Sequence, residues 1–248
     1  MALVSTDAII LQTFAYGDTS RILRLLTRAH GLQSVIAKGA KGPRARFGGV
    51  LEPFVDGVAT FYLKSQRELH TLSGFELVRA RQSLGSDLLR IGGAALIAEL
   101  ILRTGSEEAQ PELFDAVRDA LDRIQAAPTP QLEAVILGRA WHLVALLGFA
   151  PSLQECTRCG RTLGGAEEAR FSYEAGGVLC AACSVAGGGA ILPPHARSAL
   201  QRLVEGDEVV LARTGGHWKL LERYLDQHVL EGGTLRSFEF LAEALADS

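Results

Sequence analysis

The feature that most constrains the fold is a change in the spacing of apolar residues near residue 85. Before this point, short runs of β-prone residues alternate with turns. After it, apolar residues recur every three or four positions, as they do in amphipathic helices. The chain has 248 residues, of which 48% are hydrophobic, enough to bury a substantial core. The pattern predicts an α+β protein in which a β domain over residues 1–80 precedes a helical domain over residues 81–248.

Five short strands are expected in the β domain, at residues 8–12, 19–27, 32–38, 55–64 and 68–74. A tight turn at residues 29–31 joins the second strand to the third. Several glycines and Pro43 break the stretch that follows the third strand into a loop. Five strands within 80 residues are typical of a small barrel, either an OB-fold or an SH3-like barrel.

Helices are expected at residues 88–105, 111–125 and 130–151, and again from Pro194, near His217 and near Leu235. The sequence Ser86-Asp87 can cap the first of them, and Pro111 suits the first turn of the second. Residues 152–190 interrupt the helical pattern, because they are rich in glycine and contain all four cysteines.

No targeting or membrane segment is expected. The amino-terminal apolar run has no basic residue before it, unlike a signal peptide. The most apolar stretch, residues 91–102, contains Glu99 and is too short to span a bilayer. These features predict a soluble cytoplasmic protein, and in that compartment four cysteines favour metal binding over disulfide formation.

The four cysteines form two C-x2-C motifs, Cys156 with Cys159 and Cys180 with Cys183, separated by 20 residues. Two residues between ligands let both thiolates face one ion, and four thiolates complete a tetrahedron. A structural zinc ion is the favoured interpretation, and four unrelated buried thiols or disulfides are the alternatives. Such a closed shell has no open position for a catalytic water, so the metal is expected to hold together a segment too poor in apolar residues to fold alone.

One region of the chain carries basic residues and no acidic ones. No Asp or Glu occurs from Thr19 to Leu51, although the formal net charge of the whole chain is −3. Residues 1–80 have a net charge of +4 and the remaining residues one of −7. The window contains seven basic residues: Arg21, Arg24, Arg28, Lys38, Lys41, Arg44 and Arg46. A basic module in an otherwise acidic chain indicates an anionic partner.

The sequence KGAKGPRARF, at residues 38–47, is the best candidate for binding phosphates. Its glycines allow backbone amides to approach phosphates closely, and small barrels commonly bind single strands with basic grooves and stacked aromatic rings. Phe47, Tyr16 and Tyr62 are candidates for stacking, although each is a better candidate for the barrel core. An ordinary solvated surface loop is the alternative interpretation.

The sequence lacks several common catalytic motifs. G-x-S-x-G, P-loop and H-E-x-x-H sequences are absent, and so is the H-x-E of the zinc deaminases. The six histidines are scattered, and His142, on an apolar helix, is expected to be a packed residue. We therefore assign no catalytic residues, and a zinc-dependent enzyme acting on nucleic acid is a rival hypothesis that the closed metal shell disfavours.

The order of these motifs resembles that of the bacterial RecO family of recombination mediators. The similar segments are TDAIILQTFAYGDTSRILRLLT, VIAKGAKGPRARFGGVLEPF, CTRCG, VLCAAC and the closing TLRSFEFLAEAL. Arg236 in the last segment stands where a lysine is common in that family. The resemblance implies an OB-fold over residues 1–80 and a helical domain over residues 81–248, with a zinc ribbon inserted at about 152–190.

The same resemblance implies a non-enzymatic function. A member of this family would bind single- and double-stranded DNA, anneal complementary strands, and act with RecR to load the RecA recombinase onto strands coated by single-strand-binding protein (SSB). It would do so in the cytoplasm, in association with the nucleoid. The phosphate-binding residues would be Lys38, Lys41, Arg44 and Arg46, with Arg21, Arg24 and Arg28 as a second group. Strand alternation alone does not show which of the second group face outward, and a protein-interaction adaptor whose basic loop binds an acidic partner is the alternative function.

Overall fold

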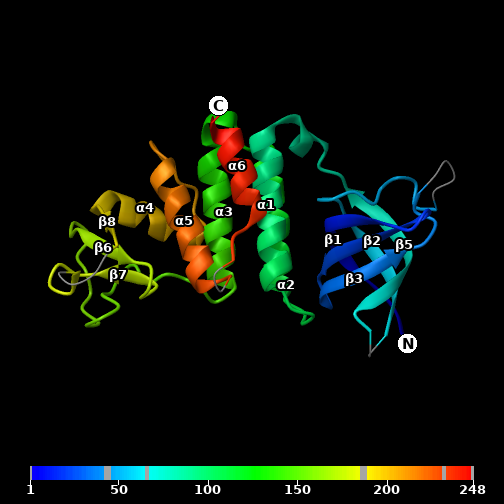
Figure 1. Ribbon diagram of the computed structural model, residues 1–248, viewed down its shortest axis with the longest axis horizontal. Helices are drawn as coiled ribbons and strands as arrows, with labels where there is room; N and C mark the ends of the chain where they lie inside the picture. Colours follow the sequence, from blue (N-terminus) through cyan, green and yellow to red (C-terminus); the bar gives the residue numbers. More distant parts are fainter. Residues whose placement is uncertain (1, 42–45, 65–66, 185–188, 231–232, 247–248) are drawn as a thin grey trace. The chain divides into compact units, whose positions relative to one another are not determined.

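The computed structural model describes residues 2–41, 46–64, 67–184, 189–230 and 233–246. The chain forms two compact units, Met1–Ala126 and Ala127–Ser248, which we describe separately (Figure 1). The domain boundary between residues 80 and 81 stays a prediction. It marks the change from strands to helices, whereas the first compact unit also includes the two helices that follow the strands.

The first unit is built on a closed barrel of five strands: β1 (Ala2–Tyr16), β2 (Ser20–Thr27), β3 (Gly31–Ala37), β4 (Asp56–Leu63) and β5 (Leu69–Arg79). Their order around the barrel is β1-β2-β3-β5-β4, and β4 pairs again with β1. Neighbouring strands are antiparallel except β3 and β5, which are parallel. This closed mixed sheet confirms the expected five-stranded, OB-like barrel.

Strand β1 is longer than the strand predicted at residues 8–12. Its first half pairs with β4 and its second half with β2, so this one strand closes the barrel. The register shifts between Ile10 and Gln12, and such a β-bulge bends a strand and increases its twist. The prediction missed the first half because the polar residues Ser5, Thr6 and Asp7 separate Ala2–Val4 from the apolar run that begins at Ala8.

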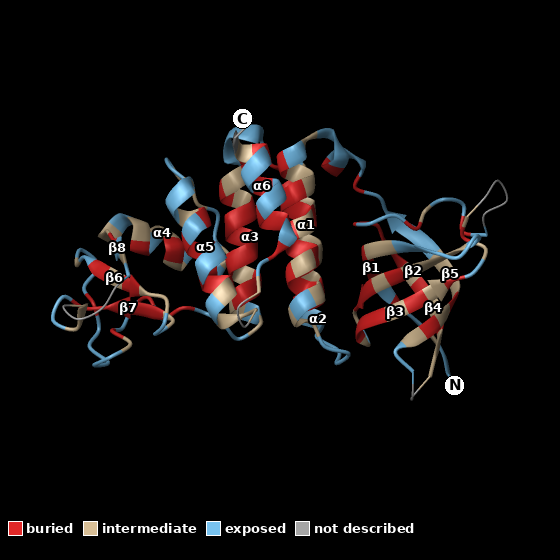
Figure 2. Ribbon diagram, viewed as in Figure 1, coloured by how far each residue is buried: buried red, intermediate tan, exposed pale blue. Residues whose placement is uncertain are grey.

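The barrel core consists of alternate side chains from all five strands, with additional residues from the loop between β3 and β4 (Figure 2). Leu23, Val35 and Phe61 are fully buried, and each such side chain stabilises the fold by about 1.5–3 kcal/mol. Phe47 belongs to the same cluster and is only 8% exposed. Phe47 is therefore a core residue and not available for stacking, which leaves Tyr16 and Tyr62 from the predicted set.

Two helices complete the first unit, α1 (Leu88–Thr104) and α2 (Pro111–Ala126), preceded by the short 3-10 helix η1 (Gln82–Ser86). Asp87 caps α1 as predicted, because its carboxylate accepts hydrogen bonds from the N–H groups of Leu89 and Arg90 at 2.8 and 3.1 Å. Helix α2 begins at Pro111, also as predicted.

The segment between α1 and α2 lies against the turn between β2 and β3. The N–H of Leu32 donates to the carbonyl of Ser106 at 2.7 Å. Gly31 has a φ of +61°, and a Cβ at this position would lie 2.3 Å from the carbonyl oxygen of Glu108. Glycine is thus required here both by the backbone conformation and by the close approach.

The second unit contains the helices α3 (Leu132–Leu146), α4 (Pro194–Glu205), α5 (Gly215–His228) and α6 (Arg236–Ala246), and the short 3-10 helix η2 (Thr129–Gln131). Helix α3 is buried over most of its surface, as its apolar sequence predicted, but it ends five residues before the predicted residue 151. Gly148, with a φ of +89°, directs the chain away from the helix.

The cysteine-containing segment between α3 and α4 folds into a small sheet of three strands: β6 (Ala169–Ser172), β7 (Gly177–Leu179) and β8 (Ala190–Leu192), in the order β7-β6-β8. A helical part with such an insert was expected, and the structure confirms it. Across the described residues, no helix combines the length and the apolar character that crossing a membrane requires.

Candidate nucleic-acid interface and metal centre

The basic loop joins β3 to β4 at one end of the barrel, beside the turn between β1 and β2 (Figure 1). Lys41 is held against that turn by two hydrogen bonds. Its N–H donates to the carbonyl of Thr19 at 3.1 Å, and its Nζ donates to the carbonyl of Gly17 at 2.9 Å. Residues 42–45, and with them the predicted phosphate ligand Arg44, lie outside the described residues.

Arg46 marks the return of the loop toward the barrel. Its N–H donates to the carbonyl of Gly39 at 2.9 Å, and its guanidinium donates to the carbonyl of Ser73 on β5 at 2.7 Å. Arg46 and Lys38 are both exposed. Within the described part of the chain, Lys38, Lys41 and Arg46 form no ion pair, so their charges are available to an external anion.

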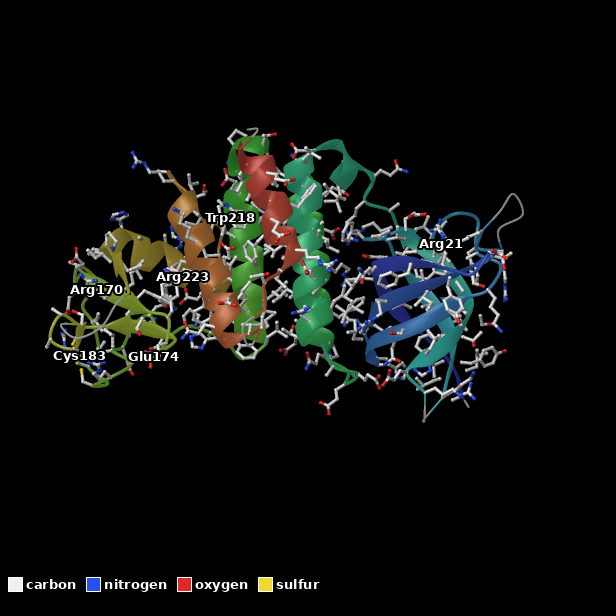
Figure 3. The ribbon with its side chains drawn as sticks, in the orientation of Figure 1. Arg21, Arg170, Glu174, Cys183, Trp218 and Arg223 are labelled. Atoms are coloured by element: carbon white, nitrogen blue, oxygen red, sulfur yellow. The ribbon has the colours of Figure 1, made fainter. Side chains whose placement is uncertain are left out.

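The second group of predicted phosphate ligands divides into paired and unpaired residues. Arg21, labelled in Figure 3, donates to the carboxylate of Glu52 at 2.7 Å. Arg28 donates to both carboxylate oxygens of Asp115 at 2.5 Å. Arg24 has no such partner among the described residues, and its Nε is buried without a hydrogen bond. Of the three, Arg24 is thus the one whose charge no described carboxylate neutralises.

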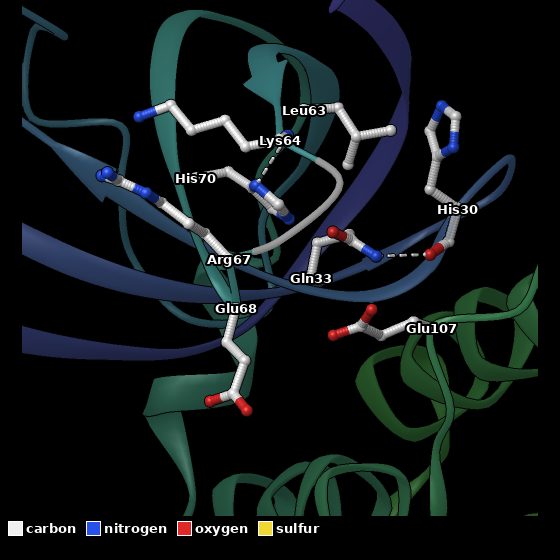
Figure 4. Close-up of a pocket in the computed structure, with 8 residues that line it drawn as sticks. All are labelled: His30, Gln33, Leu63, Lys64, Arg67, Glu68, His70 and Glu107. Carbon is white, nitrogen blue, oxygen red and sulfur yellow. Dashed lines mark hydrogen bonds between the residues drawn. The ribbon is translucent and has the colours of Figure 1, made fainter. Parts of the chain in front are cut away.

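A polar pocket lies at the opposite end of β3 from the basic loop (Figure 4). It has a volume of about 560 Å³ and is lined by His30, Gln33, Leu63, Lys64, Arg67, Glu68, His70 and Glu107. His70 is buried, and its Nδ1 accepts a hydrogen bond from the N–H of Lys64 at 3.3 Å. Burial lowers the pKa of His70, which keeps the ring neutral. The described lining residues include no serine, threonine or cysteine that would serve as a nucleophile beside this histidine.

The four cysteines come together in the second unit, in the insert between α3 and α4, which we call the ribbon; Cys183 is labelled in Figure 3. Their sulfur atoms all lie within 4.8 Å of one another, and the Sγ atoms of Cys159 and Cys180 are 3.9 Å apart. All four are free thiols, so the disulfide alternative is wrong. In a tetrahedral site with Zn–S bonds of about 2.3 Å, neighbouring sulfurs are roughly 3.8 Å apart. The donor set and its spacing therefore fit a structural metal ion.

Both C-x2-C motifs are tight turns. The backbone N–H of Gly160 donates to the carbonyl of Cys156 at 2.8 Å, and the backbone N–H of Cys183 donates to the carbonyl of Cys180 at 3.0 Å. Gly160 has a φ of +71°, the left-handed conformation that favours glycine after the first motif. The first cysteine of each pair is buried, so the turns place one shielded and one accessible thiol from each motif at the site.

The electrostatics of the cluster favour a bound cation. Burial opposes ionisation of Cys156, but hydrogen bonds from the backbone of Cys180, Cys159 and Arg158 outweigh it and lower the pKa of Cys156 to about 6. The pKa of Cys183 is raised to about 12, chiefly by the hydrogen bond between its thiol and Cys180. A cation bound by all four sulfurs would favour the thiolate form of each cysteine.

Arg197 of α4 connects the ribbon to the helical part. Its side chain is buried and donates to the carbonyls of Leu153 at 3.2 Å, Glu167 at 3.3 Å and Gly164. These bonds satisfy three loop carbonyls around the first cysteine motif. Sequence reasoning missed this role, because no local pattern distinguishes a buried arginine on an amphipathic helix from an exposed one.

Comparison with known proteins identifies the family. The model "Recombination protein O N terminal" matches residues 1–81, and "Recombination protein O C terminal" matches residues 85–237. The chain is 32% identical to the DNA repair protein RecO of Myxococcus xanthus over 97% of this chain and 98% of that protein. It is 36% identical to the DNA repair protein RecO of Anaeromyxobacter dehalogenans strain 2CP-C, over 97% of this chain and 96% of that protein.

The chain belongs to the RecO family. The resemblance drawn from the motifs is thereby confirmed over nearly the whole length. The N-terminal RecO model covers the barrel and its basic loop, whereas the C-terminal RecO model covers the four-cysteine ribbon. The two models meet at η1, the 3-10 helix between the last barrel strand and α1. The DNA repair protein RecO of Bacillus subtilis strain 168 is 32% identical over 73% of this chain and 69% of that protein.

Proposed function

We propose that this RecO-family protein binds DNA through the loop between β3 and β4 and acts as a non-enzymatic recombination mediator. The observation that carries the proposal is the set of unpaired cations at one end of the barrel. Lys38, Lys41 and Arg46 form no ion pair within the described residues, and the nearby carboxylate of Glu52 is already bonded to Arg21. Phosphates meeting these cations would release their counterions, which drives binding without sequence preference.

The proposed set of phosphate ligands follows from the pairing of each cation. Arg24 joins the loop residues because no described carboxylate neutralises it. Arg44, outside the described residues, stays in the set because it lies between Lys41 and Arg46 in the sequence. Arg21 and Arg28 contribute less, since DNA would have to displace a carboxylate hydrogen-bonded to each.

Membership of the RecO family supports the wider role. We infer that the protein binds single- and double-stranded DNA, anneals complementary strands, and acts with RecR to load RecA onto SSB-coated single strands in recombinational repair. This activity would take place in the cytoplasm, in association with the nucleoid. No residue of the chain is given a catalytic part in this proposal.

We further propose that the metal is one zinc ion held by Cys156, Cys159, Cys180 and Cys183. Four thiolates would complete its tetrahedral shell, so the ion would contribute to stability and would not activate a water molecule. This role fits a segment whose strands are only three or four residues long and would not form a stable sheet alone.

The test is the salt dependence of single-stranded DNA binding. With four loop contacts, the logarithm of the association constant should fall with that of the salt concentration with a slope of about −3 or steeper. Changing Lys38, Lys41, Arg44 and Arg46 together to alanine should weaken binding and flatten the slope by about 3. The charge-matched control changes four basic residues of the same unit outside the loop: Arg79, Arg103, Arg118 and Arg123.

Three outcomes distinguish the hypotheses. The proposal is supported if the steep salt dependence of DNA binding is lost in the loop variant and retained in the control. A loop variant that retains the parent's affinity and slope overturns the assignment of the loop. A parent that binds an acidic peptide through the loop and does not bind DNA indicates the protein-interaction adaptor.

A further inference from the structure

We propose that the outer face of β1, β2 and β3 is a stacking platform for unpaired nucleic-acid bases, on which Phe14 and Tyr16 contact bases and Arg24 and Lys38 contact phosphates. This inference rests on the proposed function and extends it. The loop alone would bind any polyanion, whereas the platform would distinguish a single strand from a duplex.

The register of the strands shows which side chains share the outer face and form the platform. Phe14 lies opposite Ile22, and Ile22 lies opposite Ile36, so these three side chains form one row across the outer face. Directly opposed residues of paired strands point to the same face. Residues one position away from this row, such as Leu23 and Val35, are fully buried inside the barrel. The row is therefore on the solvent side.

A second aromatic ring, Tyr16, and one cation, Lys38, lie on one side of this row, and a second cation, Arg24, lies on the other side. Tyr16 follows Phe14 on the same face of β1 and lies opposite Ser20. Arg24, two residues from Ile22 on β2, lies opposite Gln12 and Ser34. Lys38 directly follows the last residue of β3, two residues beyond Ile36, so continued alternation places it on the same face. Nine neighbouring positions on this part of the outer face thus combine two aromatic rings, two isoleucines and two cations with no carboxylate; the remaining three are Gln12, Ser20 and Ser34.

The two rings are unusually accessible. Phe14 is 44% exposed and Tyr16 is 53% exposed, the most exposed aromatic side chains of the first unit within the described residues. They follow each other on one strand at a spacing of two residues, about 7 Å. Because they contribute little to the barrel core, packing does not account for two large rings on this face. A base in contact with each ring would remove that apolar surface from water.

The charges around the rings favour a nucleic acid as the occupant. Lys41 is bonded to Gly17, the residue that follows Tyr16, so the anchored start of the basic loop lies beside the platform. The acidic group nearest in sequence, Asp18, lies beyond Gly17 at the tip of the turn and outside the strand. An apolar protein surface would leave these cations without partners, whereas a single strand supplies both bases for the rings and phosphates for the cations.

The platform would discriminate by the accessibility of base faces. In a duplex both faces of each base are covered by its neighbours, so only the phosphates are available to the protein. In a single strand a base can turn its face onto Phe14 or Tyr16. Stacking on an aromatic side chain contributes enough that its removal lowers affinity about tenfold for each base.

The experiment compares single- and double-stranded DNA for the variant Phe14→Ala/Tyr16→Ala. We expect the affinity for a single-stranded oligonucleotide to fall about 10- to 100-fold and the affinity for the duplex to change by less than about threefold. The salt slope should not change, since no phosphate contact is removed. Phe240→Ala is the matched control, because Phe240 is 39% exposed on α6 of the other unit.

A conservative variant tests the chemistry. Phe14→Tyr/Tyr16→Phe keeps both rings and should retain the parent's preference for single strands. An oligonucleotide containing 2-aminopurine should show fluorescence quenching on binding the parent and less quenching on binding the alanine variant. Thermal melting establishes that each variant is folded, which is expected because both side chains are largely outside the core.

The failure of this inference is distinguishable from failure of the proposed function. If the parent binds DNA with a steep salt slope and the alanine variant keeps the same ratio of single-strand to duplex affinity, the platform is overturned and the loop assignment stands. If single-strand and duplex affinities fall equally, the rings act on the fold of the loop and do not stack on bases, which also overturns the platform. If the parent binds no DNA, both proposals fail.

Discussion

Changing Arg81 to methionine is expected to destabilise the first unit strongly. The side chain of Arg81 is fully buried. It donates to both carboxylate oxygens of Asp56 at 2.6 and 2.9 Å, to Asp122 of α2 at 2.8 Å, and to the carbonyl of Phe54 at 2.8 Å. Burial lowers the pKa of Arg81, but the two carboxylates outweigh this effect and raise it, so the residue is charged. Phe54 has a φ of +67°, a conformation uncommon for residues other than glycine, and the bond from Arg81 supports it.

The magnitude follows from what the substitution leaves behind. Methionine fills much of the volume but leaves the carboxylate of Asp56, whose side chain is 9% exposed, without a counterion. Removing one partner of a buried ion pair destabilises a protein by about 3–5 kcal/mol. Arg79 offers a matched control, because it also pairs with Asp122 but its side chain is 51% exposed. Arg79→Met should destabilise by at most about 1 kcal/mol.

The assay is urea unfolding of the full chain, with hydrogen exchange in barrel peptides used to follow the first unit by itself. Arg81→Met should unfold at a much lower urea concentration than Arg79→Met. The double variant Arg81→Met/Asp56→Leu should recover part of the loss, since the uncompensated carboxylate is then gone. Equal midpoints for the two single variants would refute the reasoning, and so would a double variant less stable than Arg81→Met.

Two further predictions concern the metal and pH. Elemental analysis of the native protein should find one zinc ion per chain. Cys156→Ser or Cys180→Ser, each of which changes a buried ligand, should lower both the metal content and the melting temperature. Native protein that contains no metal would contradict this prediction. Burial lowers the pKa of His70, so the unfolded chain takes up a proton at higher pH than the folded one, and the free energy of unfolding should decrease as the pH falls below about 6.5. His70→Asn, which retains an acceptor for the N–H of Lys64, should lose less stability than the parent between pH 7.5 and 5.5, and an identical loss would exclude His70 as the cause.

The order of elements could be predicted from the sequence because it depends on local patterns. Apolar period, turn residues and helix caps such as Asp87 act within a few residues of each other. The length of β1 could not be predicted in the same way. Its first half is stabilised by pairing with β4, about 50 residues further along the chain, and not by its own apolar pattern.

The same distinction applies to the candidate sites. The cysteine cluster was predictable because two residues between ligands already bring each pair of thiols together. The availability of the basic residues was not predictable. Arg21 and Arg28 have the same chemistry as Arg24, but the carboxylates that accept hydrogen bonds from them lie 31 and 87 residues away in the sequence. The window without acidic residues is partly neutralised by acidic residues from outside it.

The basic residues without an ion pair among the described residues and the two exposed rings would contribute to DNA affinity in different ways. Their contributions can be told apart because they depend differently on salt concentration. Screening weakens phosphate contacts, with a slope of about −0.7 per contact on single strands and about −0.9 on duplexes. Stacking involves no counterion release and is not weakened in this way. For four shared contacts, duplex affinity would fall with a slope of about −3.6 and single-strand affinity with one of about −2.8. The preference for single strands should therefore increase with salt in the parent. In the Phe14→Ala/Tyr16→Ala variant the ratio of single-strand to duplex affinity should be lower at every salt concentration but should increase with salt at the same rate. The rate of increase depends on the charge density of the nucleic acid, whereas the size of the ratio depends on the two rings.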